Sequence, residues 1–203
     1  MKVKVTLPEN NSDITLLQFQ KYEKLLKKKG LTSNEFSKRA VSIFSNLKYN
    51  DLQGVKLSDF TDIVDQITKA LNTEVDFTER FFLDGVEYGF IPNLNDITTA
   101  EYVDLVEYDT KPETLNKVMA ILFRRIESED VFGNYSIINY TGTKETSQIM
   151  LQMPMNIVNG ALVFFSNLSR ELRIAIQKST QKEIRRVQKL QDTLRNGVGT
   201  QQL

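Results

Sequence analysis

The sequence predicts an α+β protein that is predominantly α-helical, with a small antiparallel β-hairpin or sheet and a long C-terminal helix. Three observations support this class. Apolar residues recur at helical spacing behind N-capping residues in the first third of the chain. An Asp-Gly pair joins two strand-like runs in the middle, and residues 155–195 contain no Pro and only one Gly, Gly160.

Three helices are expected in the first third of the chain. The first covers about residues 16–29 and is followed by Gly30, a common helix stop. The second opens at a capping box formed by Thr32 and Glu35. Ser58 is predicted to cap the third helix, whose apolar residues follow helical spacing: Phe60, Ile63, Val64, Ile67 and Leu71.

The middle of the chain predicts a β-hairpin over residues 75–90. Asp84 and Gly85 lie between two runs rich in β-branched and aromatic residues, and both residue types tolerate the positive φ of a tight hairpin turn. A further strand is expected over residues 135–140.

Two helices are expected between these strands. Thr98 and Glu101 form another capping box, which opens a short helix. A second helix begins near Pro112, a residue well tolerated at the first helical position, and runs to about Ile126.

The last third predicts one long helix that changes character along its length. Its first half is strongly apolar, whereas past Ile176 it is rich in Lys, Arg and Gln. A helix this polar gains little from packing on its own domain, so we expect it to meet a partner. The candidate partner-binding residues are Ile184, Val187, Leu190, Leu194, Arg185 and Arg186.

These patterns predict one domain and an appendage. Residues 1–176 are expected to form a compact, mostly helical domain that contains the hairpin. Residues 177–195 are expected to form a projecting basic helical extension, and residues 196–203 a disordered tail.

Charge is balanced overall but unevenly distributed. Lys and Arg number 26, as do Asp and Glu, so the formal net charge is zero. Residues 74–113 carry 11 acidic side chains and two basic ones, whereas residues 170–195 carry eight basic and three acidic side chains. The two regions could complement each other within one chain or between copies, or both could be ordinary solvated surface. The pair Arg124-Arg125 could clamp a phosphate, but such pairs more often supply positive charge at a helix C-terminus or form surface ion pairs.

The absence of two residue types argues against catalysis. The chain contains no His and no Cys, so triads that depend on imidazole or a thiolate cannot be built, and most zinc sites lose their ligands. We therefore expect no enzyme, and we predict no catalytic, cofactor-binding or metal-binding residues. A carboxylate-only metal-dependent enzyme remains the least favoured alternative.

The sequence also predicts a location. The longest apolar stretch, residues 161–165, is far too short to cross a bilayer, and the N-terminus lacks the apolar run of a signal peptide. These two observations predict a cytosolic protein.

Four blocks of the chain form a recognisable pattern: FLDGVEYGFIPNL at residues 82–94, AEYVDL at 100–105, MAILFRR at 119–125 and MPMNIVNGALVFFSNL at 153–168. These blocks resemble small proteins of tailed bacteriophages. Those proteins are encoded among virion structural genes, and some are regarded as tail-assembly-chaperone-like. The resemblance extends from about Lys2 to Leu172 and implies a role in phage morphogenesis, with a location in the host cell cytoplasm or in the virion.

The resemblance and the composition together predict a protein that binds virion components. It would act as an assembly chaperone, or as a minor structural or cargo part near the head–tail axis. Other phage structural proteins are the expected partners, a homo-oligomer is left open, and no membrane partner is expected. The alternative is a nucleic-acid-binding protein that uses the basic C-terminal helix on packaged DNA.

Overall fold

The computed structural model describes residues 5–109, 111–164 and 166. The chain divides into two units, Met1–Leu162 and Val163–Leu203. The elements below belong to the first unit, apart from the end of the helix that begins at residue 155. The predicted boundary at residue 176, the extension and the tail lie outside the described residues.

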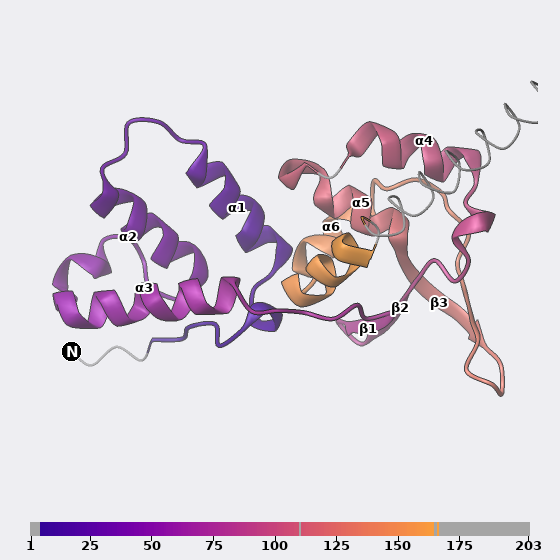
Figure 1. Cartoon of the computed structure of the whole chain (residues 1–203), viewed down its shortest axis with the longest axis horizontal. Coiled ribbons are helices and arrows are strands. Elements are labelled where there is room, and N and C mark those ends of the chain that lie inside the picture. Colours follow the sequence, from indigo (N-terminus) through magenta and orange to yellow (C-terminus); the bar gives the residue numbers. More distant parts are fainter. Residues whose placement is uncertain (1–4, 110, 165, 167–203) are drawn as a thin grey trace, which may run out of the picture. The chain divides into compact units, whose positions relative to one another are not determined.

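Three helices follow one another in the first third, as predicted. They are α1 (Leu16–Leu26), α2 (Ser33–Phe44) and α3 (Leu57–Leu71), and Figure 1 shows them grouped together. Their contacts run from α1 to α2 and from α2 to α3. Short 3₁₀ turns lie beside them, η1 (Asn11–Asp13) and η2 (Asp51–Gly54).

The capping residues explain where these helices begin. The Thr32 hydroxyl accepts a hydrogen bond from the Glu35 amide, and the Glu35 carboxylate accepts one from the Thr32 amide, so the predicted capping box is confirmed. The predicted cap of α3 was wrong. Lys56 occupies that position without a side-chain cap, and the Ser58 hydroxyl instead donates to Asp59 at 3.1 Å.

A four-stranded antiparallel sheet follows, in the order β1-β2-β3-β4. Its strands are β1 (Arg80–Leu83), β2 (Val86–Phe90), β3 (Phe123–Glu129) and β4 (Tyr135–Ile137). Asp84 and Gly85 form the β1–β2 turn with φ of 49° and 78°, as the hairpin prediction requires. The first strand begins at Arg80, five residues later than expected.

The main error in the sequence prediction concerns the helix that was expected to run to Ile126. The 3₁₀ turn η4 (Pro112–Thr114) leads into α5 (Leu115–Leu122), which stops where β3 begins. Phe123 then pairs with Phe90, and Arg125 pairs with Tyr88. Pairing with a strand more than 30 residues earlier overrides the local helical pattern, because β propensity depends on tertiary context.

The remaining elements complete the sequence order. They are η3 (Leu94–Asp96), α4 (Thr99–Tyr108), α6 (Thr146–Ile149) and η5 (Met150–Gln152), and residues 155–164 are helical. The expected continuation of this helix to residue 195 lies outside the described residues.

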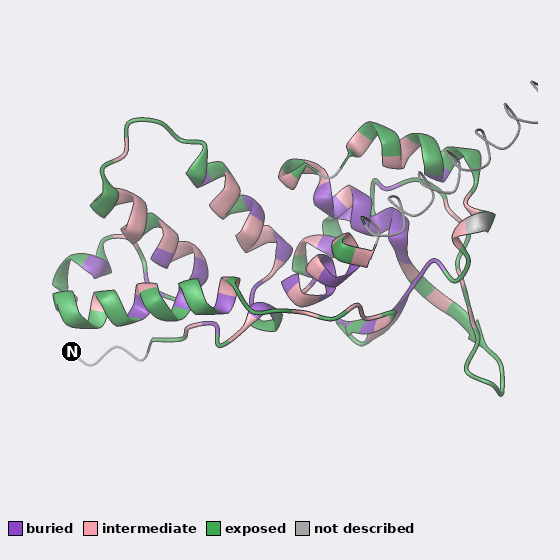
Figure 2. Cartoon of the chain, viewed as in Figure 1, coloured by how far each residue is buried: buried purple, intermediate pink, exposed green. Residues whose placement is uncertain are grey.

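The best-buried part of the first unit lies along α5 and the start of β3, which are purple in Figure 2. Phe123 is fully buried, and its ring meets those of Phe81 and Phe90 edge to face at 5.3 and 5.2 Å. Gly160 allows its helix to lie close to the backbone of Asp76. A Cβ atom there would lie 2.5 Å from the Asp76 carbonyl oxygen, so any larger residue would collide with the backbone.

Candidate functional site

The six residues predicted to bind a partner, Ile184, Val187, Leu190, Leu194, Arg185 and Arg186, lie outside the described residues. The alternative that uses the same helix on DNA also depends on that part of the chain, so both stay predictions. The candidate sites described below therefore come from residues 5–164.

A buried ion pair connects α4 to β3. Glu101 is 2 % exposed and Arg124 is 11 % exposed, and Arg124 Nη2 lies 2.6 Å from Glu101 Oε1. The other carboxylate oxygen, Oε2, accepts hydrogen bonds from the Thr98 amide and hydroxyl at 2.7 and 2.6 Å. One carboxylate therefore caps α4 and neutralises a buried guanidinium. The capping-box pattern predicts the first of these roles but not the second.

Tyrosines extend this cluster. The Tyr140 hydroxyl donates to Asp104 Oδ2, and the Arg124 guanidinium lies over the Tyr140 ring at 5.9 Å. Burial raises the pKa of Tyr140, and the bond to Asp104 raises it further, so the phenol stays protonated at neutral pH. Burial lowers the pKa of Arg124, which the negative charge of Glu101 opposes.

The cluster is better suited to holding α4 in place than to chemistry. Arg124 does not reach out to bind a phosphate, because its charge is already matched by Glu101. The neighbouring Arg125 is exposed. Arg124 does form an ion pair, as one of the predictions for the Arg124-Arg125 pair has it, but the pair is buried and lies on a strand, not at the surface or at a helix end.

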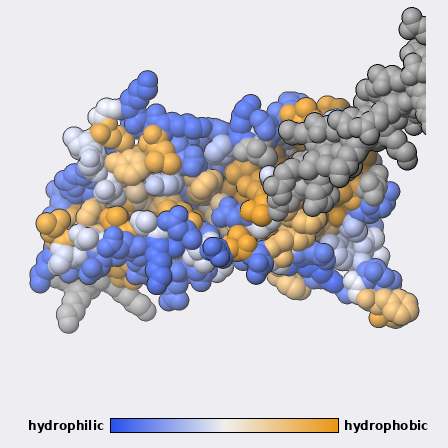
Figure 3. Space-filling model, viewed as in Figure 1, coloured by the Kyte–Doolittle hydropathy of each residue, from blue (hydrophilic) through white to orange (hydrophobic). Residues whose placement is uncertain are grey.

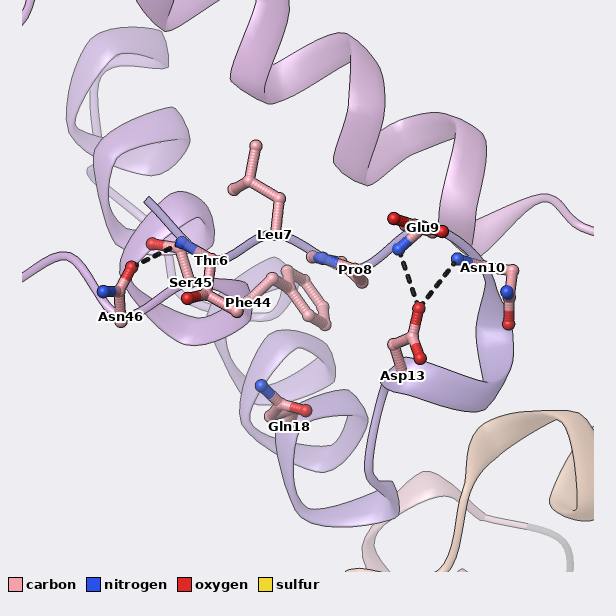
Figure 4. Close-up of a pocket in the computed structure, with 10 residues that line it drawn as sticks. All are labelled: Thr6, Leu7, Pro8, Glu9, Asn10, Asp13, Gln18, Phe44, Ser45 and Asn46. Carbon is pink, nitrogen blue, oxygen red and sulfur yellow. Dashed lines mark hydrogen bonds between the residues drawn. The ribbon is translucent and has the colours of Figure 1, made fainter. Parts of the chain in front are cut away.

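A pocket of about 650 Å³ lies where the N-terminal segment crosses the helices (Figure 4). The residues that line it are mostly polar: Thr6, Leu7, Pro8, Glu9, Asn10, Asp13, Gln18, Phe44, Ser45 and Asn46. Two of these polar side chains bind backbone amides of the N-terminal segment. Asp13 Oδ2 accepts from the Glu9 and Asn10 amides, and Asn46 Oδ1 accepts from the Thr6 amide at 2.8 Å.

Two further features, a cluster of metal ligands and a membrane-spanning helix, are absent from the described residues. Across residues 5–109 and 111–164, no group of three or more acidic side chains is placed to hold a metal ion. In the same part of the chain, no helix has both the length and the apolar character needed to span a bilayer.

The strongest candidate for an interaction site is the loop between β3 and β4. Val131 and Phe132 lie at its end and are 93 % and 86 % exposed. Figure 1 shows this hairpin extending past the rest of the sheet, and its end is coloured hydrophobic in Figure 3. We call residues 130–134 the hairpin tip. Fully exposed large apolar side chains are costly to leave in water, so they often mark a binding surface.

The hairpin tip has a fixed conformation. Asp130 Oδ1 accepts hydrogen bonds from the Phe132 and Asn134 amides at 2.8 and 2.9 Å, and Oδ2 accepts one from Asn134 Nδ2 at 2.8 Å. Gly133 has a φ of 85°, which favours glycine. These bonds lower the pKa of Asp130, the Asn134 side chain most of all, so the carboxylate is ionised at neutral pH and keeps the loop closed.

The sequence prediction missed this tip. The signal was present, because an Asp, a Gly and an Asn stand between two strand-like runs, as is typical of a hairpin loop. The predicted helix to about Ile126 covers the first part of β3, so no hairpin was predicted there.

Comparisons with known proteins add no further assignment. No family model matches the chain, and searches of curated proteins and of solved structures give no match.

Proposed function

We propose that this chain is a bacteriophage morphogenesis protein without catalytic activity of its own. It binds virion components, either as an assembly chaperone or as a minor structural or cargo part near the head–tail axis. The sequence blocks quoted above support the phage context. The observation that carries the binding role is the hairpin tip, where Val131 and Phe132 are almost fully exposed in a hydrogen-bonded loop.

The geometry of the tip favours binding because little freedom is lost when it docks. A flexible loop must be ordered on association, and that ordering opposes binding. Here Asp130 and Gly133 already fix the backbone, so an aromatic side chain is presented in a defined direction. Aromatic residues that enter a partner's pocket contribute a large share of the binding energy in protein interfaces.

The charges near the tip favour a protein over a lipid surface. Asp130 lies within the tip, and Glu129 precedes it, with its carboxylate bound by Arg80 at 2.9 and 2.5 Å. Glu127 and Arg125 are both exposed on the same strand and carry opposite charges. The charge within the tip itself is the carboxylate of Asp130, which an anionic membrane repels and a protein pocket with a basic rim would attract.

Replacing Phe132 with Ser tests this role. Loss of a central aromatic contact costs about 2 kcal/mol or more, equivalent to roughly 30-fold weaker binding. The tagged chain is purified from infected host cells, and the captured virion proteins are quantified by mass spectrometry. We expect the Phe132→Ser chain to retain only a small fraction of the virion proteins that the unchanged chain captures.

Phe82→Ser is the matched control, because Phe82 is also exposed on the same sheet but lies away from the hairpin tip. It should capture virion proteins as the unchanged chain does. Circular dichroism verifies that both variants are folded. Equal capture by the two variants would contradict the role of the tip.

A further inference from the structure

A second exposed apolar surface lies on α4 (Thr99–Tyr108). Tyr102, Val103 and Val106 are each more than half exposed, although Glu101 on the same helix is buried. Their spacing of one and four residues places them on one side of the helix. We call these three residues the α4 face.

The α4 face has acidic neighbours on its own helix. Glu107 is exposed beside Val106, and Asp104 follows Val103, where its carboxylate accepts a hydrogen bond from the Tyr140 hydroxyl. The wider segment from residue 74 to residue 113 carries 11 acidic and two basic side chains. A partner for this surface should therefore combine apolar side chains with positive charge.

The chain itself contains a segment with this chemistry. Residues 182–195 carry Ile184, Val187, Leu190 and Leu194 at intervals of three or four, which is the spacing of one helix face. Basic side chains stand between them, among them Arg185, Arg186 and Lys189. Apolar pattern and charge both match the α4 face.

We propose that residues 182–195 of one copy dock on the α4 face of a second copy. A partner in another molecule is favoured by the sequence that precedes the segment. Residues 165–183 contain neither Pro nor Gly, so they predict an uninterrupted helix. At about 1.5 Å per residue, a continuous helix over residues 165–183 would be about 28 Å long, so we expect the segment to lie far from the start of that helix.

We expect the exchange to be reciprocal. When each of two copies places its segment, residues 182–195, on the α4 face of the other, both faces are occupied and the dimer is closed, with two identical contacts. The inference does not depend on the proposed function, because the α4 face and the hairpin tip share no residue.

The test uses two variants that should each be unable to form a dimer alone but should form a heterodimer when mixed. Val106→Lys puts a positive charge on the α4 face, which repels the basic segment, and deletion of residues 179–203 removes that segment. By analytical ultracentrifugation the unchanged chain should sediment as a dimer, and each variant should sediment as a monomer. An equimolar mixture should form a one-to-one heterodimer, because the truncated chain offers its α4 face and the Val106→Lys chain offers its segment. This mixed dimer keeps one contact of two, so it should dissociate more readily than the unchanged dimer.

Val131→Lys is the matched control, since it makes the same change on the hairpin tip, and it should dimerise normally. Circular dichroism verifies that every variant is folded. Three results would overturn the inference: a monomeric unchanged chain, a dimeric Val106→Lys chain, or a mixture that remains monomeric although the unchanged chain dimerises. The last result would indicate that the segment acts within its own chain or elsewhere.

Discussion

Replacing Glu101 with Ala is expected to lower the free energy of unfolding by about 3–5 kcal/mol, as is typical when one partner of a buried ion pair is removed. The substitution leaves the Arg124 guanidinium buried without its counter-charge. It also removes the acceptor of two hydrogen bonds from Thr98, which cap the start of α4. Urea denaturation followed by circular dichroism measures the loss.

Two further variants separate the charge from other effects. Glu107→Ala makes the same change at an exposed position of α4 and should alter stability by no more than about 0.5 kcal/mol. The double variant Glu101→Gln, Arg124→Met keeps a capping oxygen and removes both charges, so it should recover most of the lost stability. A Glu101→Ala chain as stable as the Glu107→Ala chain would refute the structural role of the pair.

Replacing Phe123 with Ala is expected to cost about 3–5 kcal/mol of stability, the usual range for removing a buried aromatic ring. Phe123 is fully buried at the first position of β3, and two other rings pack edge to face against it. The substitution leaves a cavity beside both rings. The midpoint of urea unfolding should fall, with the slope of the transition unchanged.

Phe82→Ala serves as the comparison, because it removes the same ring from an exposed position of β1. Its effect on stability should be small. Similar losses for the two variants would show that position 123 is not part of the core.

The buried ion pair and the α4 face are connected through one helix. Glu101 fixes the start of α4 from its buried side, while Tyr102, Val103 and Val106 face solvent on the other. Loosening the pair should therefore disturb the surface on which we place the second copy. A buried ion pair is often no more stabilising than apolar residues of the same size. Positioning the α4 face would be a separate reason to retain it.

Local chemistry explains which elements could be predicted from the sequence. The capping boxes at Thr32 and Thr98 and the Asp84-Gly85 turn depend on side chains within a few residues, and all three were predicted correctly. The α+β class followed from these elements. The strand β3 was not predicted, because residues 123–126 continue the apolar pattern of α5 and only their pairing with β2 makes them extended.

The candidate sites were harder to predict for a similar reason. The apolar residues of α4 look like core residues in the sequence, and only the structure shows that Tyr102, Val103 and Val106 are exposed. The hairpin tip was not predicted, because residues 123–126 at the start of its first strand continue the helical pattern of α5. The apolar series from Ile184 to Leu194 was identified from its spacing and stays a prediction.

The central claim is that this chain works by binding virion proteins. Chemical crosslinking of assembling particles in infected host cells, followed by mass spectrometry, tests it most directly. We expect crosslinks between this chain and at least one virion structural protein, and a sharp decrease in them for the Phe132→Ser chain. Crosslinks to no virion protein, with the chain present and folded in those cells, would contradict the account.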